Sequence, residues 1–228
     1  MISQNGFLLS YIKYGENDAV LHCFTEEDGF QSYFLKGIYS KKNKKKAFLL
    51  PLNKLNFSVN AGKNSGIQTL SKFEITEMND VYTDIKANTV IFFIADFLNQ
   101  ILRNEHKNEL IFSAIDEFIA QLNHQNYRSH LVFLTKILKI QGVAPLLSDG
   151  NFLDPETGTF SNHGTHHFFD SENSLLWKLI LSSENPYEIK IPQALRKNFL
   201  DSLLIYYHYH ITDFKTPNSL EIIQQIFE

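Results

Sequence analysis

The 228-residue sequence predicts an α+β protein in which a small antiparallel β-barrel is followed by an α-helical bundle. Two observations predict this fold class. In the first third of the chain, strand-forming residues occur in short runs that turn-forming residues separate. From about residue 80 onward, hydrophobic residues recur with the 3.6-residue period of α-helices. We therefore expect two domains, at residues 1–78 and 79–228.

Five strands are predicted in the first domain. The first run ends at a turn-forming cluster, residues 15–18, and the second alternates until the hairpin signal at residues 27–29. Pro51, inside the fourth run, predicts an edge position or a bulge, because proline cannot donate a hydrogen bond to a sheet. The predicted strands are residues 7–14, 19–25, 31–38, 48–59 and 67–75.

Five short strands without a helix long enough for a parallel crossover favour closure into a barrel. The number and length of the strands suit an OB-fold, and an SH3-like barrel or a small sandwich is the structural alternative. OB-folds bind oligonucleotides across one face and its loops. The first domain is therefore predicted to bind nucleic acid.

The second domain is predicted to be helical apart from one insertion. Hydrophobic stripes predict helices at residues 91–102, 110–122 and 131–138, and Gly142 and Pro145 end the third. Residues 148–170 lack periodicity and predict an irregular insertion. The predicted bundle is completed by a short helix at 175–181, a long helix with Pro192 in its first turn that runs to residue 211, and a last short helix after 216–219.

Positive charge is concentrated in one window of a chain whose formal net charge is −4. Residues 29–73 contain nine Lys and no Asp or Glu, whereas residues 74–228 contain 11 Lys and Arg against 20 Asp and Glu, a net charge of −9. Such an uneven field attracts long polyanions such as nucleic acid. A lysine run between strands is equally typical of a solvated loop or of a guard against strand pairing.

The densest part of this window is residues 36–46, KGIYSKKNKKK, which we call the lysine loop. Lysines bind phosphates without reading bases, and aromatic rings stack on bases. Tyr39 in the loop, and Tyr33 or Phe34 on the preceding strand, are candidate stacking rings, with a core position as the alternative for the strand rings. The predicted DNA-binding residues are Lys36, Tyr39, Lys41, Lys42, Lys44, Lys45, Lys46, Lys54, Lys63 and Lys72.

Composition indicates a globular cytoplasmic protein. The single cysteine, Cys23, excludes an internal disulfide framework and fits a reducing compartment. No apolar run approaches the ~18–20 residues that a membrane span needs, and the N-terminus lacks a signal segment.

The sequence contains no standard catalytic motif, so we expect no enzyme activity and no cofactor. It lacks a glycine-rich phosphate loop, a G-x-S-x-G elbow and an H-E-x-x-H pair. His163, His166 and His167 are the best candidates for metal ligands, although ordinary loop histidines are commoner than a site whose ligands come from one segment. A metal-dependent enzyme that uses these histidines and a polybasic protein that binds anionic membranes remain the alternatives.

Three stretches together resemble the bacterial recombination mediator RecO family. YGEND at residues 14–18, leading to FTEEDG at 24–29, is similar to the first hairpin of that family. Lys36-Gly37 before the basic loop and LPL at 50–52 after it resemble the next hairpin. LKIQGVAPL at 138–146 resembles the end of a central helix, and the predicted order of barrel, bundle, insertion and closing helices also matches.

The resemblance implies a mediator of DNA repair and recombination in the bacterial cytoplasm, at the nucleoid. Such a protein binds single- and double-stranded DNA without sequence specificity, anneals complementary strands and aids recombinase loading onto DNA covered by single-strand-binding protein. Its implied partners are RecR and the acidic, apolar C-terminal tail of single-strand-binding protein, which the helical domain binds. Candidate tail-binding residues, which combine cations with apolar side chains on one predicted helix, are Arg128, Leu131, Phe133, Lys136 and Lys139.

One departure from the family pattern concerns metal. Many members carry a four-cysteine zinc site in the insertion, whereas no cysteine follows Cys23 in this sequence. A zinc ribbon is therefore not available. We expect the insertion to be held by packing, with Phe152, Leu153, Phe160 and Phe168 as the candidates.

Overall fold

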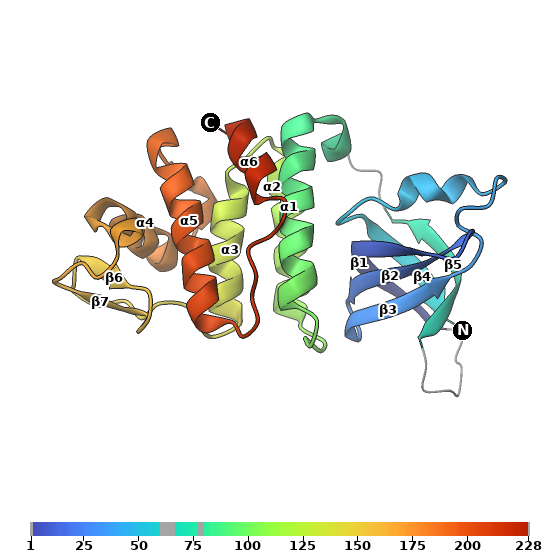
Figure 1. Ribbon diagram of the computed structural model, residues 1–228, viewed down its shortest axis with the longest axis horizontal. Coiled ribbons are helices and arrows are strands. Elements are labelled where there is room, and N and C mark those ends of the chain that lie inside the picture. The colour runs from blue at the N-terminus through green and yellow to red at the C-terminus, as the bar shows by residue number, and fades with distance from the viewer. Residues whose placement is uncertain (1, 60–66, 77–79, 228) are drawn as a thin grey trace. The chain divides into compact units, whose positions relative to one another are not determined.

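A computed structural model describes residues 2–59, 67–76 and 80–227 of the chain, and Figure 1 shows a β-barrel and a set of α-helices. The predicted α+β class is confirmed. The chain forms two compact units: unit 1 comprises residues 1–112 and 217–227, and unit 2 comprises residues 113–216. The predicted domain boundary at residues 78 and 79 stays a prediction. Among the described residues, no helix combines the length and the apolar character needed to cross a bilayer.

The barrel consists of five strands in the order β1-β2-β3-β5-β4, and β4 closes the ring on β1. Neighbouring strands pair antiparallel except β3 and β5, which are parallel. The predicted small barrel is confirmed, and this one pair departs from the antiparallel expectation, because an odd number of strands cannot alternate in direction all the way around a ring. The strands are β1 (Ile2–Tyr14), β2 (Asp18–Thr25), β3 (Gly29–Leu35), β4 (Lys54–Val59) and β5 (Gln68–Ile75).

Side chains from all five strands fill the interior of the barrel. Tyr33 is buried there, and its hydroxyl accepts a hydrogen bond of 2.7 Å from Nε2 of Gln4. Tyr33 is thus a core residue and not a stacking ring. Cys23 is also fully buried, and this burial raises the pKa of its thiol to about 12, so the thiol stays protonated at neutral pH.

The fourth strand is shorter than predicted. It begins at Lys54, whereas Phe48 belongs to a short 3₁₀ helix, η1 (Lys44–Phe48). Pro51 therefore lies in a turn before the strand, and not inside an edge strand or a bulge. The backbone N–H of Leu52 donates to Leu8 O at 2.6 Å, which fixes this turn against β1.

Helices α1 (Ile85–Ile101) and α6 (Leu220–Phe227) pack together in unit 1. Asp84 caps the first turn of α1, because its carboxylate accepts hydrogen bonds from the backbone N–H groups of Lys86 and Ala87. The barrel is bonded to α1 and to the segment after it. Ser10 Oγ donates to Asn99 Oδ1 at 2.9 Å, and the Phe30 N–H donates to Glu105 O at 2.9 Å.

Unit 2 is built around buried aromatic side chains. Trp177 is fully buried and donates from Nε1 to Ser202 Oγ at 3.0 Å, and its ring lies 5.4 Å from that of Phe199. Pro192 precedes the long fifth helix as its N-cap and does not lie in its first turn. The helices are α2 (Glu109–Asn123), which begins in unit 1, α3 (Ser129–Ile140), α4 (Ser171–Ser182) and α5 (Gln193–His210).

The insertion is more regular than predicted, because it contains a two-stranded hairpin of β6 (Phe152–Asp154) and β7 (Thr159–Ser161). Leu153 and Phe160 are buried, as expected. Phe152 and Phe168 are only half-buried, and Phe169 is the ring that lies in the core.

His130 on α3 provides a prediction about acid stability. Burial lowers the pKa of its imidazole to about 4, and Nδ1 is 2.7 Å from Tyr127 O. An unfolded histidine titrates near 6.5, so the stability that neutral His130 contributes is complete above that pH and is lost as the pH falls toward 4. At 1.36 kcal/mol per pKa unit, the loss is about 3 kcal/mol.

Urea unfolding at pH 7 and pH 4.5 measures this effect. We expect the free energy of unfolding to fall by about 2 kcal/mol less in a His130→Asn variant than in the wild type. Equal falls in the two proteins would show that His130 does not control this transition.

Candidate nucleic-acid interface

The lysine loop is tied to the neighbouring β1–β2 hairpin by two hydrogen bonds that its backbone N–H groups donate. The N–H of Gly37 donates to Asp18 Oδ1 at 2.8 Å, and the N–H of Tyr39 donates to Asn17 O at 2.9 Å. Ile38, between the two donors, is fully buried in the barrel core. The start of the lysine loop therefore has a fixed position next to the hairpin.

A tight turn fixes the remainder of the loop. Asn43 accepts a hydrogen bond of 2.9 Å on Oδ1 from the N–H of Lys45, so that it caps η1, and its Nδ2 donates to Gly37 O at 3.1 Å. Leu49, directly after η1, is buried in the same core as Ile38. The lysines are thus carried by an ordered segment with a hydrophobic anchor on each side.

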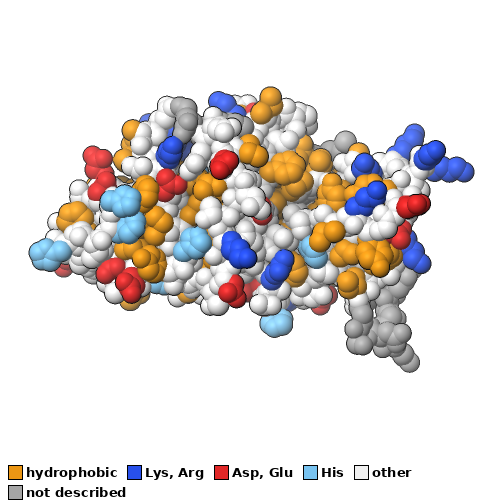
Figure 2. Space-filling model, viewed as in Figure 1, with side chains coloured by type: hydrophobic (Ala, Val, Ile, Leu, Met, Phe, Trp, Pro, Cys, Tyr) orange, Lys and Arg blue, Asp and Glu red, His pale blue; other side chains and the backbone are white. Residues whose placement is uncertain are grey.

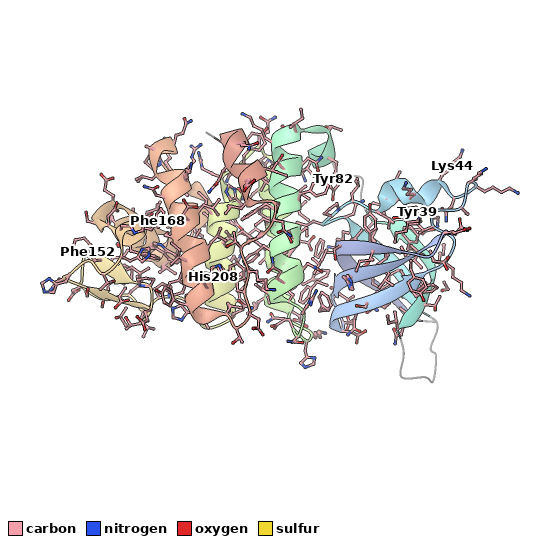
Figure 3. All side chains as sticks on the ribbon, in the orientation of Figure 1. Tyr39, Lys44, Tyr82, Phe152, Phe168 and His208 are labelled. Carbon is pink, nitrogen blue, oxygen red and sulfur yellow. The ribbon has the colours of Figure 1, made fainter. Side chains whose placement is uncertain are left out.

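Five of the nine predicted lysines have exposed side chains on this loop. Figure 2 shows Lys and Arg side chains gathered over the end of the barrel that carries η1, and Figure 3 shows Lys44 extending away from the barrel. None of the nine residues between the first and last of the five is acidic, so the local field is positive. The exposed loop lysines are Lys36, Lys41, Lys42, Lys44 and Lys46.

Lys45 and Lys72 lie near the loop but are already engaged. Lys45 is half-buried, and its Nζ donates to Phe73 O at 2.9 Å. Lys72 pairs with Glu74 at 2.8 Å, and this hydrogen bond is the main reason that the pKa of the Glu74 carboxyl is lowered. These two lysines support the positive field but, because they are already bonded, are less available to phosphates than the five loop lysines.

Lys54 lies against two aromatic rings and not on the lysine loop. Its Nζ lies 5.5 Å from the ring centroid of Phe7 and 5.2 Å from that of Phe112, on the side of β1 that meets the helices of unit 1. The structure therefore does not bring Lys54 together with the other predicted DNA-binding lysines. Lys63 lies outside the described residues.

Two lysine ammonium groups lie near the ring of Tyr39. Nζ of Lys46 lies 5.1 Å and Nζ of Lys13 lies 5.5 Å from its centroid, distances that suit cation–π attraction. Partial burial and the neighbouring Tyr11 hydroxyl raise the pKa of Tyr39, so it stays neutral. Sequence reasoning missed Lys13, because it precedes the lysine-rich window, although its position two residues after Tyr11 places both on one face of β1.

Comparison with known proteins identifies the family. The model described as "Recombination protein O N terminal" matches residues 1–79, and the model described as "Recombination protein O C terminal" matches residues 82–219. The chain belongs to the RecO family. Its role is therefore in DNA repair and recombination.

Curated relatives match the RecO assignment over nearly the whole chain. The DNA repair protein RecO of Flavobacterium psychrophilum is 32% identical over 238 residues, which cover 99% of both chains. The proteins of the same name from Flavobacterium johnsoniae and Bacteroides fragilis are 28% and 24% identical and cover 99% and 98% of both chains. The resemblance that the sequence motifs indicated is confirmed.

The structure corrects the prediction of the tail-binding residues. Leu131 and Phe133 are both 0% exposed, so they are core residues and offer no surface to a partner. Lys136 is bonded to Glu117, and Nζ of Lys139 donates to Leu181 O at 3.1 Å. Only the cationic part of the predicted cluster, which also includes the half-buried Arg128, lies at the surface of unit 2.

Two of the three insertion histidines, His166 and His167, pack on each other and on neighbouring rings, whereas His163 is exposed. The rings of His166 and His167 are stacked 4.7 Å apart, and Nδ1 of His166 accepts a hydrogen bond from the N–H of Phe168. Within the part of the chain that the structure describes, no three His, Cys, Asp or Glu side chains are placed to hold a metal ion. The geometry therefore gives no support to the metal-dependent alternative.

Proposed function

We propose that this RecO-family chain binds single- and double-stranded DNA without sequence specificity through its lysine loop. The observation that supports the proposal is the set of five exposed lysines on one ordered loop at an end of the OB-like barrel. Ammonium groups at such a site pair with phosphates and carry no information about base sequence. No bond is made or broken in this function, so the proposed activity is not enzymatic.

Strand annealing follows from the same contacts. Two complementary strands repel each other through their phosphates, and this repulsion decreases when lysines neutralise phosphates on both strands. We propose that the chain anneals strands in this way and aids recombinase loading onto DNA that single-strand-binding protein covers. In a bacterial cytoplasm, such a protein would associate with the nucleoid.

A salt series on the wild-type chain tests the proposal. Fluorescence anisotropy with oligonucleotides of mixed sequence should give affinities that do not depend on sequence. If five lysines engage phosphates, log K should fall with log[salt] with a slope of about −3.5 for single strands and about −4.5 for duplexes. The absence of binding at low salt would contradict DNA binding itself.

We also propose RecR and the acidic, apolar tail of single-strand-binding protein as partners. For the tail, the described surface of unit 2 offers Lys139 beside the C-terminal end of α4, where Leu179 is exposed. A cation and an exposed aliphatic side chain at the same helix end suit a peptide that ends in acidic and apolar residues.

Binding of a synthetic tail peptide tests this site. We expect Lys139→Glu to weaken binding about tenfold, because a repulsive charge replaces an attractive one. Lys190→Glu, which makes the same charge change at another exposed lysine of unit 2, is the matched control and should bind the peptide as the wild type does. Equal weakening by both variants would point to net charge and not to this site.

A further inference from the structure

The outer face of the barrel next to the lysine loop carries an apolar patch. Ile12 pairs with Val20 across β1 and β2, and Val20 pairs with Phe34 across β2 and β3, so the three side chains form a row over three strands. Tyr14, two residues beyond Ile12, extends the row. Tyr14 is 61% exposed and Ile12 is 60% exposed. We call Ile12, Tyr14, Val20 and Phe34 the outer patch.

Tyr14 and Phe34 meet at right angles in this patch. Their ring centroids are 5.6 Å apart and their planes form an angle of 82°. In such an edge-to-face pair, the edge of one ring meets the face of the other. Tyr14 is thus held in place by Phe34 while most of its surface stays open to solvent. A fixed, exposed ring of this kind offers a stacking surface at a low cost in conformational entropy.

The start of the lysine loop adjoins the outer patch. Lys36 follows Phe34 by two residues, directly after the end of β3, and begins the loop. The β1–β2 hairpin that Tyr14 enters is bonded to Gly37 and Tyr39 of the loop. Asp18 accepts a hydrogen bond from the Gly37 N–H at this junction, and the exposed Glu16 is a second acidic side chain of the hairpin. The outer patch therefore adjoins the start of the lysine loop.

We propose that the outer patch stacks the unpaired bases of a single strand whose phosphates lie on the lysine loop. This inference rests on the proposed DNA binding and adds to it a preference for single strands. Every base has a face that can stack on an aromatic ring, so the contact does not select a sequence. In a duplex the bases are already stacked on one another, so a duplex gains from the lysines but not from the patch.

The chemistry of a nucleotide explains why single-stranded nucleic acid is the occupant that fits this patch. A purely apolar partner would use the rings and leave the adjacent lysines without counter-charges, whereas a single strand carries an apolar base face and an anionic phosphate in each nucleotide. The pairing of rings and cations on the protein therefore complements the repeating unit of the ligand.

Tyr14→Ala tests this proposal. With a 20-nucleotide single strand we expect its affinity to fall about tenfold, because stacking contributes ~1–3 kcal/mol per base. The affinity for a duplex of the same length should change less than twofold, and the salt slope should stay the same. Tyr14→Phe, which keeps the ring, should bind like the wild type, and Tyr209→Ala removes an exposed tyrosine from α5 as the control.

A single strand without bases provides a second readout. The wild type should bind an abasic strand about tenfold more weakly than a normal strand, and the Tyr14→Ala variant should bind both with the same affinity. Equal losses for single strand and duplex, or no loss with the normal strand, would overturn the proposal. If the wild type binds DNA and the Tyr14→Ala variant binds it equally well, only the stacking role is refuted. If the wild type binds no DNA, the proposed function is refuted.

Discussion

Glutamine at all five exposed lysines of the lysine loop is expected to lower DNA affinity on the order of a thousandfold at 0.1 M salt. Five phosphate contacts release about 3.5 counterions from a single strand, and each released ion contributes one decade of affinity per decade of salt dilution. The slope of log K against log[salt] should therefore approach zero in this variant. Anisotropy titrations at four or more salt concentrations measure both quantities. The changed residues are Lys36, Lys41, Lys42, Lys44 and Lys46.

A second variant separates the position of these charges from their number. It carries glutamine at five exposed lysines elsewhere, so its net charge equals that of the loop variant. We expect it to keep most of the wild-type affinity and slope. If both variants lose the same affinity, the net charge of the chain and not the loop would control binding. The control residues are Lys86, Lys139, Lys190, Lys197 and Lys215.

Gly29→Ala is expected to destabilise unit 1 by about 3 kcal/mol or more. Gly29 has a φ of 69°, where a side chain costs about 1 kcal/mol. A Cβ at this position would also lie 2.3 Å from His106 C and 2.4 Å from Glu105 O. These are backbone atoms that cannot rotate away, so the hairpin would have to separate from the segment after α1, which adds a cost typical of overpacking. The midpoint of thermal or urea unfolding measures the loss.

Gly37→Ala is the matched control for this substitution. Its φ of 66° is nearly the same, but no heavy atom lies within 4 Å of the position that its Cβ would take. We expect a loss of about 1 kcal/mol, from backbone strain alone. Equal destabilisation by the two substitutions would show that the approach of Gly29 to the Glu105–His106 backbone has no energetic weight.

Local pattern predicted five strands and their closure into a barrel, but it placed the start of β4 wrongly. Phe48 and Leu49 are apolar and adjoin a strand, so they look like strand residues in the sequence. In the structure their role is to anchor the loop, since Leu49 is buried in the barrel core directly after η1. A residue that anchors a loop and a residue inside a strand can both be apolar. Only the closed barrel shows which role each residue has.

The candidate site was predicted best where residues adjacent in sequence are also adjacent in space. The lysine loop is such a segment. Lys54 shares the lysine-rich window but lies at the side of the barrel that meets the helices. Lys13, on β1, lies outside the window, yet its Nζ is 5.5 Å from the centroid of the Tyr39 ring. Strand pairing brings distant residues together, and a window of sequence does not record it.

The sequence contains a signal that Leu131 and Phe133 belong to the core. Residues 131–135 read LVFLT, an almost unbroken apolar run and not a stripe on one side of α3, and all five are buried. A helix that is apolar all round is enclosed by its neighbours. The cations that follow, Lys136 and Lys139, mark where α3 reaches the surface, and the apolar residues before them belong to the core.

The odd number of strands has a consequence for the motion of the barrel. The parallel seam between β3 and β5 joins only Tyr33 with Gln68 and Phe34 with Thr69, and parallel pairs are slightly weaker per residue than antiparallel ones. The barrel should therefore open locally most often at this seam. The backbone amides of the seam should exchange hydrogen for deuterium fastest among those of the β-strands. Phe34 belongs to both the seam and the outer patch. A DNA strand stacked on the patch should therefore hold β3 and β5 together and slow that exchange.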